Sequence, residues 1–227
     1  MSEILRAEKI SKRFKIGDKY VDALNSVDLS FSKGECVSIM GPSGSGKSTL
    51  LYLLGLIDTL SMGHIYFNGQ KISSLSSRKK AHFRSMHIGF IFQSFYLLPE
   101  LNCLQNVCLP AFIQDKKNFW KKNEFAKKAR NMLIKVGLEE RILHKPTELS
   151  GGEMQRVAIC RSLMNEPSVI LADEPTGNLD SKNSDMIANM LQSISKKENK
   201  TVIIATHNES LAHRADKIVI LKDGMIQ

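Results

Sequence analysis

The chain has 227 residues, of which 42% are hydrophobic and 24% are charged, a balance typical of a globular domain with its own core. The longest apolar run, residues 50–57, is far shorter than the roughly 20 residues of a membrane helix. Charges interrupt the N-terminal region where a signal peptide would be apolar, so we expect a cytosolic location. The net charge of +9 leaves nucleic acid, anionic lipid or a phosphorylated small molecule as candidate partners.

Short apolar strands alternate with helices along most of the sequence. In chain order we predict strands over 27–31 and 36–40, a helix over 48–57, strands over 65–67 and 88–92, a strand over 169–172, a helix over 186–194, and strands over 202–205 and 218–221. Asn68-Gly69 predicts a tight turn. This alternation implies a mainly parallel sheet covered on both faces, with ligands at the carboxyl ends of its strands.

The middle of the chain has a different character. From about residue 99 to residue 148, apolar residues recur at helical spacing and strand signals fade. We interpret residues 1–227 as a single domain whose α/β core carries an inserted helical subdomain at about residues 99–160. The four cysteines form no CxxC pair and have no histidine at zinc-ligand spacing, so we expect reduced, buried thiols.

A glycine-rich turn after the second strand carries the first chemical motif. Its residues are Gly41, Pro42, Ser43, Gly44, Ser45, Gly46, Lys47, Ser48 and Thr49. The segment fits G-x-x-x-x-G-K-[ST], in which successive backbone N–H groups and a helix N-terminus surround phosphate oxygens. Lys47 would place its charge near the β- and γ-phosphates, and the Ser48 hydroxyl would bind Mg²⁺. The motif predicts a site for ATP.

Two carboxylates follow the buried strand at residues 169–172. In a phosphate-binding protein of this type, the first carboxylate can hold Mg²⁺ and the second can accept a proton from the attacking water. We therefore predict Asp173 as a metal residue and Glu174 as the general base. On its own, an Asp-Glu pair after a strand more often caps the next helix.

The third motif is Leu149-Ser150-Gly151-Gly152-Glu153-Met154-Gln155-Arg156. Ser150 and Glu153 have the spacing of a capping box at a helix start. Two glycines in a first turn each weaken a helix by roughly 1 kcal/mol relative to alanine. Their presence is reasonable if a phosphate must closely approach the bare N–H groups.

These motifs, in this order, resemble the ATP-binding domain of ABC transporters over nearly the whole chain. The resemblance implies a P-loop NTPase core with a mainly parallel sheet, an N-terminal antiparallel β part and an inserted α-helical subdomain. It also implies that Gln93 contacts Mg²⁺ and the attacking water, and that His207 holds the γ-phosphate. Asp180 matches a loop of the nucleotide site. Phe14 takes the place of a tyrosine that stacks on adenine, with Tyr20 as a weaker candidate.

In that family two domains associate head to tail, so that the phosphate motif of one and the signature helix of the other enclose each ATP. The resemblance therefore implies a homodimer, or a dimer with a close paralogue, with two ATP molecules at its interface. ATP binding would close the dimer and hydrolysis would open it. This cycle would drive separate membrane subunits, through which the chain would contact the membrane.

Within the family the sequence is most similar to the LolD and MacB-type group. The shared segments are Ala172–Asp180, Gly89–Gln93 and Leu97–Leu101. Met154 and Cys160 depart from the group's usual arginine and alanine, but neither position carries direct chemistry. We expect no fused membrane region, which favours the LolD type over MacB itself. That likeness implies lipoprotein release at the inner membrane through permease subunits of LolC/LolE type.

Two other interpretations remain open. The chain could serve another ABC complex, such as an FtsE-like cell-division system, a peptide or macrolide exporter, or a nutrient importer. It could also be an ABC ATPase that acts on nucleic acid or ribosomes, which the charge of +9 allows. Proteins of this last kind usually carry two cassettes or a long coiled-coil insert. This sequence shows a single cassette and no heptad run, so we expect no nucleic-acid partner.

Overall fold

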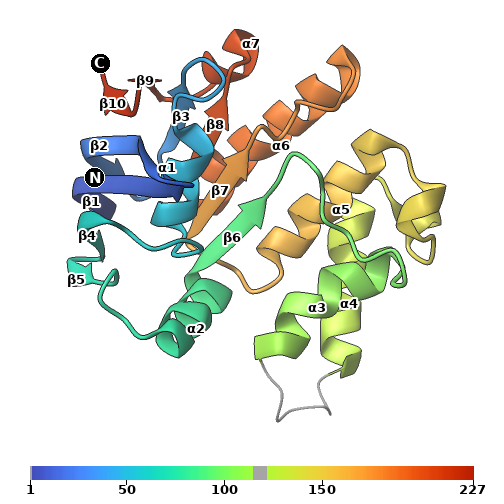
Figure 1. Cartoon of the computed structure of the whole chain (residues 1–227). Coiled ribbons are helices and arrows are strands. Elements are labelled where there is room, and N and C mark those ends of the chain that lie inside the picture. The colour runs from blue at the N-terminus through green and yellow to red at the C-terminus, as the bar shows by residue number, and fades with distance from the viewer. Residues whose placement is uncertain (1, 115–121) are drawn as a thin grey trace.

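The computed structural model describes residues 2–114 and 122–227, and residues 115–121 of the predicted helical subdomain lie outside the described part. Two sheets form the body of the molecule (Figure 1). The first is antiparallel, in the order β2-β1-β4-β5, and consists of β1 (Glu3–Ile16), β2 (Lys19–Ser32), β4 (Met62–Phe67) and β5 (Gln70–Lys71).

The second sheet is mainly parallel and has the order β10-β9-β3-β8-β7-β6. Its strands are β3 (Cys36–Met40), β6 (Ile88–Ile91), β7 (Val169–Asp173), β8 (Thr201–Thr206), β9 (Lys217–Lys222) and β10 (Met225–Ile226). Only the short pair of β9 and β10 is antiparallel among the strands described in this sheet. This arrangement confirms the predicted α/β fold with a parallel core sheet and an antiparallel N-terminal part.

The helices are α1 (Lys47–Leu54), α2 (Ser77–His87), α3 (Cys103–Gln114), α4 (Lys122–Lys135), α5 (Gly151–Leu163), α6 (Ser181–Glu198) and α7 (Glu209–Ala212). Two 3-10 turns, Glu139–Arg141 and Pro146–Glu148, precede α5. In the described ranges, no helix combines the length and the apolar character needed to cross a bilayer. Figure 1 shows α3, α4 and the start of α5 grouped to one side of the two sheets.

The burial pattern of the central strands explains the layers. Along β7, Val169 and Leu171 join the cluster shared with α1 and the antiparallel sheet, whereas Ile170 and Ala172 join the cluster shared with α5 and α6. A strand buried on both faces needs apolar residues at every position, as this one has. A third cluster is formed by α3, α4 and α5. All four cysteines are free and buried, as predicted.

The structure corrects several predicted boundaries. The helix predicted to reach residue 57 ends at Leu54, because Gly55 caps it and Leu56 has a left-handed backbone, φ 56°. β6 ends at Ile91 and not at residue 92. α2 was not predicted, since none of its residues is fully buried and its sequence shows no apolar face.

Candidate functional site

A pocket of 530 Å³ opens at the carboxyl ends of the parallel strands, where ligands of such sheets bind. It is lined by Ala23, Ser43, Gly44, Gly46, Lys47, Ser48, Thr49, Gln93, Glu174 and His207. The loop between β3 and α1, the end of β7 and the end of β8 therefore meet here. The structure brings together most of the predicted phosphate, metal and catalytic residues, although they come from four distant parts of the sequence.

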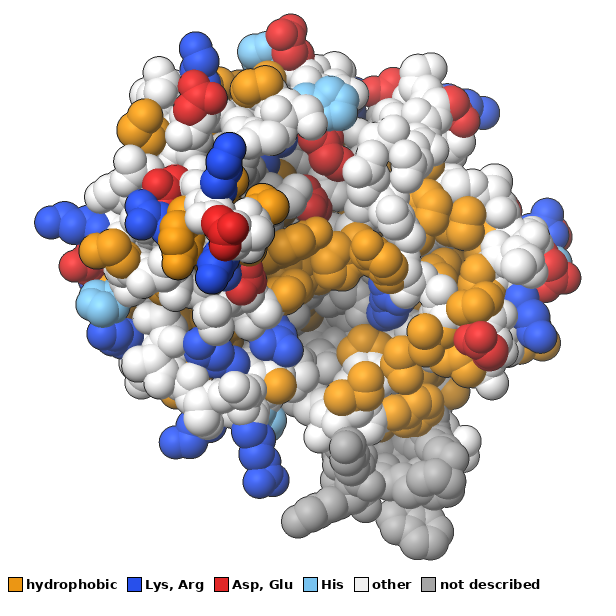
Figure 2. Space-filling model, viewed as in Figure 1, with side chains coloured by type: hydrophobic (Ala, Val, Ile, Leu, Met, Phe, Trp, Pro, Cys, Tyr) orange, Lys and Arg blue, Asp and Glu red, His pale blue; other side chains and the backbone are white. Residues whose placement is uncertain are grey.

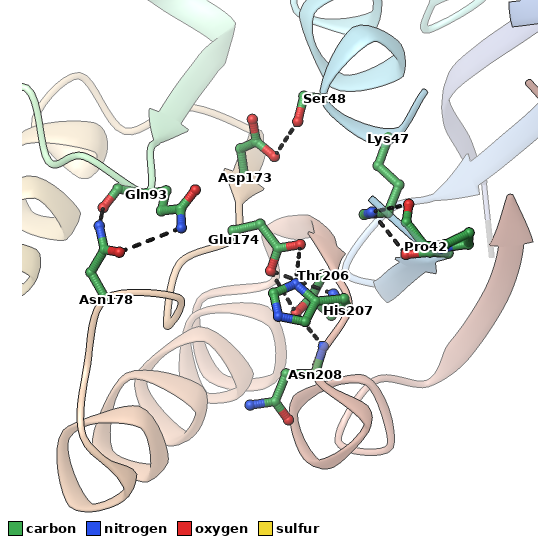
Figure 3. A network of polar contacts seen from close by, with 11 residues as sticks. Pro42, Lys47, Ser48, Gln93, Asp173, Glu174, Asn178, Thr206, His207 and Asn208 are labelled. Atoms are coloured by element: carbon green, nitrogen blue, oxygen red, sulfur yellow. Dashed lines mark hydrogen bonds and ion pairs between the residues drawn. The ribbon is translucent and has the colours of Figure 1, made fainter. Parts of the chain in front are cut away.

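The glycine-rich loop is tightly constrained by its neighbours. Gly46 has a φ of 102°, which L-residues rarely adopt, and a Cβ there would lie 2.5 Å from the carbonyl oxygen of Ala23. The Lys47 ammonium donates to the carbonyl oxygens of Gly41 (2.8 Å) and Pro42 (3.0 Å), as Figure 3 shows. The loop therefore keeps its lysine beside the N-terminus of α1, where both favour an anion.

The hydroxyl of Ser48, which lines the pocket, meets a buried carboxylate. The Ser48 hydroxyl donates to Asp173 Oδ1 at 2.9 Å, and Asp173 is only 7% exposed. Burial raises the pKa of the Asp173 carboxyl above its ordinary value, while hydrogen bonds from Ser48 and Tyr52 and the charge of Lys47 oppose that rise. These hard oxygen donors are the ligands that Mg²⁺ prefers, so the predicted metal pair Ser48 and Asp173 fits that ion.

Glu174 lies at the end of β7 with its carboxylate held by three neighbouring groups. Its backbone is left-handed, φ 44°, and its side chain is 14% exposed. Glu174 Oε1 lies 2.8 Å from His207 Nδ1, and Oε2 accepts from the Thr206 hydroxyl at 3.2 Å and the His207 N–H at 3.4 Å (Figure 3). The two predicted catalytic residues thus contact each other directly at the pocket wall.

Gln93 reaches the same pocket from the loop that follows β6. Asn178 Nδ2 donates to the Gln93 carbonyl oxygen at 3.1 Å, and Gln93 Nε2 lies 3.5 Å from Asn178 Oδ1. These two contacts fix the loop after β6 against the loop after β7. The third predicted catalytic residue therefore lines the pocket together with the phosphate loop and Glu174, and Figure 3 shows its contacts with Asn178.

The signature residues do not join this pocket. Ser150 caps α5 and accepts from the Glu153 N–H at 3.3 Å, while Glu153 Oε2 accepts from the Ser150 N–H at 2.8 Å, which confirms the predicted capping box. The Ser150 N–H is the main reason that the pKa of the Glu153 carboxyl lies below its ordinary value.

The two signature glycines differ in their surroundings. A Cβ at Gly152 would lie 2.3 Å from the Asn183 side chain, so close packing of α5 on α6 is sufficient to explain that glycine. A Cβ at Gly151 would have only ordinary contacts, at 3.4 Å or more. Close approach of a phosphate to bare N–H groups therefore explains Gly151 better than it explains Gly152.

Two further predicted site residues lie outside the pocket lining. Asp180 caps α6 and accepts from the Asn183 N–H at 2.8 Å, and this bond is the chief cause of its lowered pKa. Phe14 on β1 is 38% exposed, and the Lys12 ammonium lies 4.7 Å from its ring centroid. Tyr20 is 63% exposed on β2. Both aromatic rings are accessible, but neither belongs to the phosphate pocket.

Comparison with known proteins decides the family. A family model described as ABC transporter matches residues 24–177, about two thirds of the chain. The chain belongs to the ABC transporter family. As an ATP-binding cassette of this family, it is an ATPase.

Solved structures of other cassettes agree closely with this one. A dimeric, post-hydrolysis structure of the cassette MJ0796 bound to ADP and Pi has a TM-score of 0.92 and 40% identity, covering 99% of this chain and 97% of that chain. A second dimeric structure of MJ0796, described as a bacterial ABC transporter cassette, has a TM-score of 0.91, 41% identity and the same coverage. The ADP conformation of the cassette MJ1267 is 30% identical, with a TM-score of 0.85, covering 100% and 90%.

Sequence reasoning missed two groups at the site of this cassette. Tyr52 follows Ser48 by one helical turn, and its hydroxyl bonds to Asp173; burial and that carboxylate raise the pKa of Tyr52 to about 12. The spacing of four residues on α1 could have indicated this contact. Thr206 holds the Glu174 carboxylate from β8. Only the strand order places it there, so no local signal could have found it.

Proposed function

We propose that this cassette hydrolyses ATP to drive the release of lipoproteins from the bacterial inner membrane, bound at its cytoplasmic face to two permease subunits of LolC/LolE type. The observation that carries the ATPase part is the convergence of Lys47, the Ser48–Asp173 pair and the Glu174–His207 pair in one pocket. The lipoprotein part is supported by the sequence segments shared with the LolD and MacB-type group.

Each residue in the pocket has a role that follows from its position. Lys47 and the N–H groups of the loop from Gly41 to Gly46 would hold the terminal phosphates. Glu174 would accept the proton of the attacking water, and His207 would bind the γ-phosphate once it turns from Glu174. Gln93 would orient the water from the opposite side. Phe14 would stack on the adenine ring.

The Ser48 hydroxyl and the Asp173 carboxylate, assisted by Gln93, would hold Mg²⁺. The ion would supply positive charge to the β- and γ-phosphate oxygens. Asp173 fits this role because its carboxylate is nearly inaccessible and its protein partners include two hydroxyls, from Ser48 and Tyr52. A buried carboxylate with such neutral partners favours binding of a cation.

A second copy of the chain would complete each site. Ser150 and Gly151 lie at an exposed helix start away from the pocket of their own chain. We therefore propose a head-to-tail homodimer in which the signature residues of one protomer, with Asp180 nearby, face the phosphate loop of the other. The dimeric MJ0796 structures support this arrangement.

An apolar groove of 520 Å³ is the proposed contact with the permease. It lies between β6, α2 and α3, and Figure 2 shows apolar side chains gathered around this hollow. Phe90, Phe92, Tyr96, Leu109 and Ile113 contribute to its lining. Because Phe92 and Tyr96 flank Gln93 in the sequence, a permease segment seated here would act directly on the loop that carries Gln93.

Isolation of the membrane complex tests the proposed assignment. The tagged chain would be purified from membranes in mild detergent, and its membrane partners would be identified and reconstituted with a labelled lipoprotein. Release of the lipoprotein into solution only with hydrolysable ATP would support the proposal. Partners of cell-division, exporter or importer type, with no release, would assign one of the alternatives. A Glu174→Gln complex is the matched control for ATP-dependent release.

A further inference from the structure

The loop that carries Gln93 has an unfavourable backbone. Phe95 and Tyr96, two and three residues after Gln93, have φ angles of 55° and 47°. Bulky L-residues rarely adopt this left-handed conformation, and two in succession are rarer still. Such a conformation persists only where the surrounding structure holds it in place.

Arg161, in the last turn of α5, holds the backbone of Phe95 and Tyr96 in place. Its Nη2 donates to the Phe95 carbonyl oxygen at 2.6 Å, and its Nη1 donates to the Tyr96 carbonyl oxygen at 2.5 Å. The planar guanidinium fork suits this pair of acceptors, whereas a lysine ammonium does not match them both in one fixed plane. Burial lowers the pKa of the Arg161 guanidinium. Its hydrogen-bond partners among the described residues are these two carbonyls, so the side chain is placed to hold the loop.

The position of Arg161 connects three functional features. Its helix, α5, begins at the signature residues Gly151 and Gly152. Its side chain lines the apolar groove together with Tyr96. The loop that it holds is fixed at its other end by Asn178, next to the pocket. Arg161 therefore links α5 and the groove to the loop that carries Gln93, through its hydrogen bonds to Phe95 and Tyr96.

We propose that Arg161 is a positioning residue for hydrolysis, which holds the left-handed turn at Phe95 and Tyr96 and thereby keeps Gln93 in the pocket. The inference rests on the role proposed above for Gln93. Arg161 does not contact the phosphate loop, so ATP binding is expected to be independent of it. Its loss should slow the hydrolysis step and leave the affinity for nucleotide unchanged.

The test compares two arginines of the same groove. Arg161→Lys should lower kcat for Mg-ATP about tenfold, since small displacements of positioning groups can slow catalysis this much, while KM changes less than about twofold. Arg84→Lys is the matched control: Arg84 is half-buried, lines the same groove and donates to the carbonyl oxygen of Leu56, another left-handed residue, at 2.8 Å. Its kcat should stay within about twofold of the parent. Equal kcat losses in both variants would overturn the proposal.

A second variant tests the mechanism. Asparagine adopts the left-handed conformation more readily than tyrosine, so Tyr96→Asn should restore at least part of the kcat lost in Arg161→Lys. Thermal melting should show that both variants are folded, and both should bind ATP normally. If kcat does not recover under these conditions, the two hydrogen bonds of Arg161 do not act through the loop. Gln93→Ala distinguishes the role proposed for Gln93 from the role proposed for Arg161. If it leaves kcat unchanged, the role of Gln93 is wrong; if it lowers kcat and Arg161→Lys does not, only the role of Arg161 is wrong.

Discussion

The phosphate loop and the signature turn both begin a helix with glycines, yet their surroundings differ sharply. Around the phosphate loop, Lys47 and Ser48 have partners inside the chain, and the pocket brings in groups from three strand ends. At the signature turn, Ser150 bonds mainly with Glu153 of its own helix. The first half-site is assembled by one chain, whereas the second would receive phosphate groups from the partner in the proposed head-to-tail dimer.

The largest expected effect concerns Glu174, the proposed base in the first half-site. Glu174→Gln keeps the size of the side chain but removes its ability to accept a proton, so steady-state ATP hydrolysis should fall at least about 100-fold, while ATP binding and dimerisation persist. Phosphate release and size-exclusion chromatography with ATP measure both. Glu166→Gln, at another left-handed carboxylate remote from the pocket, is the matched control. Normal turnover by Glu174→Gln would exclude it as the base.

The next largest effect concerns nucleotide affinity. Lys47→Ala removes a charged hydrogen-bond donor from the phosphates, so the Kd for Mg-ATP should rise about 10- to 100-fold. Titration with a fluorescent ATP analogue measures the change. Lys200→Ala, which removes a lysine that donates to the Pro167 carbonyl oxygen, should bind as the parent does. An unaltered affinity in Lys47→Ala would contradict the assignment of the loop.

A mixing experiment asks directly whether the two half-sites belong to different protomers. A heterodimer of Lys47→Ala with Ser150→Ala should retain one intact head-to-tail site and hydrolyse ATP. A heterodimer of the double variant with the parent chain should have a defect in both sites, and should be about tenfold slower. If both half-sites served one chain, the order of the two activities would be reversed.

The smallest effect is on stability and depends on pH. Since burial raises the pKa of Asp173, the folded state disfavours its ionised form, and this penalty appears as the pH rises through the folded pKa. Without Mg²⁺, Asp173→Asn should therefore melt about 2–4 °C higher than the parent at pH 7.5, with a smaller difference at pH 4. Differential scanning calorimetry tests this. A lower melting temperature at pH 7.5 would mean that the charge is stabilising.

The difference between the phosphate loop and the signature turn also explains how far the site could be predicted from the sequence. The strand, loop and helix around Lys47 are local in sequence, so their pattern was sufficient to predict them. The end of α1 was not predictable, because it depends on Gly55, where a Cβ would lie 2.0 Å from the Phe90 ring. The role of His207 came only from the family resemblance, and its contact with Glu174 was not predicted, since that contact requires β7 and β8 to be neighbours.

The long-range contacts of the helical part could not be predicted either, because they also depend on which elements are neighbours in space. Arg161 reads as an ordinary cation in the last turn of a helix, and its two acceptors are backbone carbonyls some 65 residues away. Hydrogen bonds to backbone carbonyls do not require a particular type of residue, so they produce no recognisable pattern in the sequence. α2 lacks an apolar face, and it is placed by Arg84 and by Phe83 against Phe67, which a periodicity argument does not detect.

The strand order has a consequence for protein synthesis. β3, which leads into the phosphate loop, lies between β8 and β9, and the Gly224 N–H donates to the Ser45 carbonyl oxygen at 3.1 Å. A nascent chain therefore carries the nucleotide motif long before its neighbouring strands leave the ribosome, since translation proceeds from the N-terminus. Until almost the last residues emerge, the growing polypeptide lacks strands and contacts that hold the phosphate loop, so it cannot form a stable nucleotide site. A product truncated there would not hydrolyse ATP.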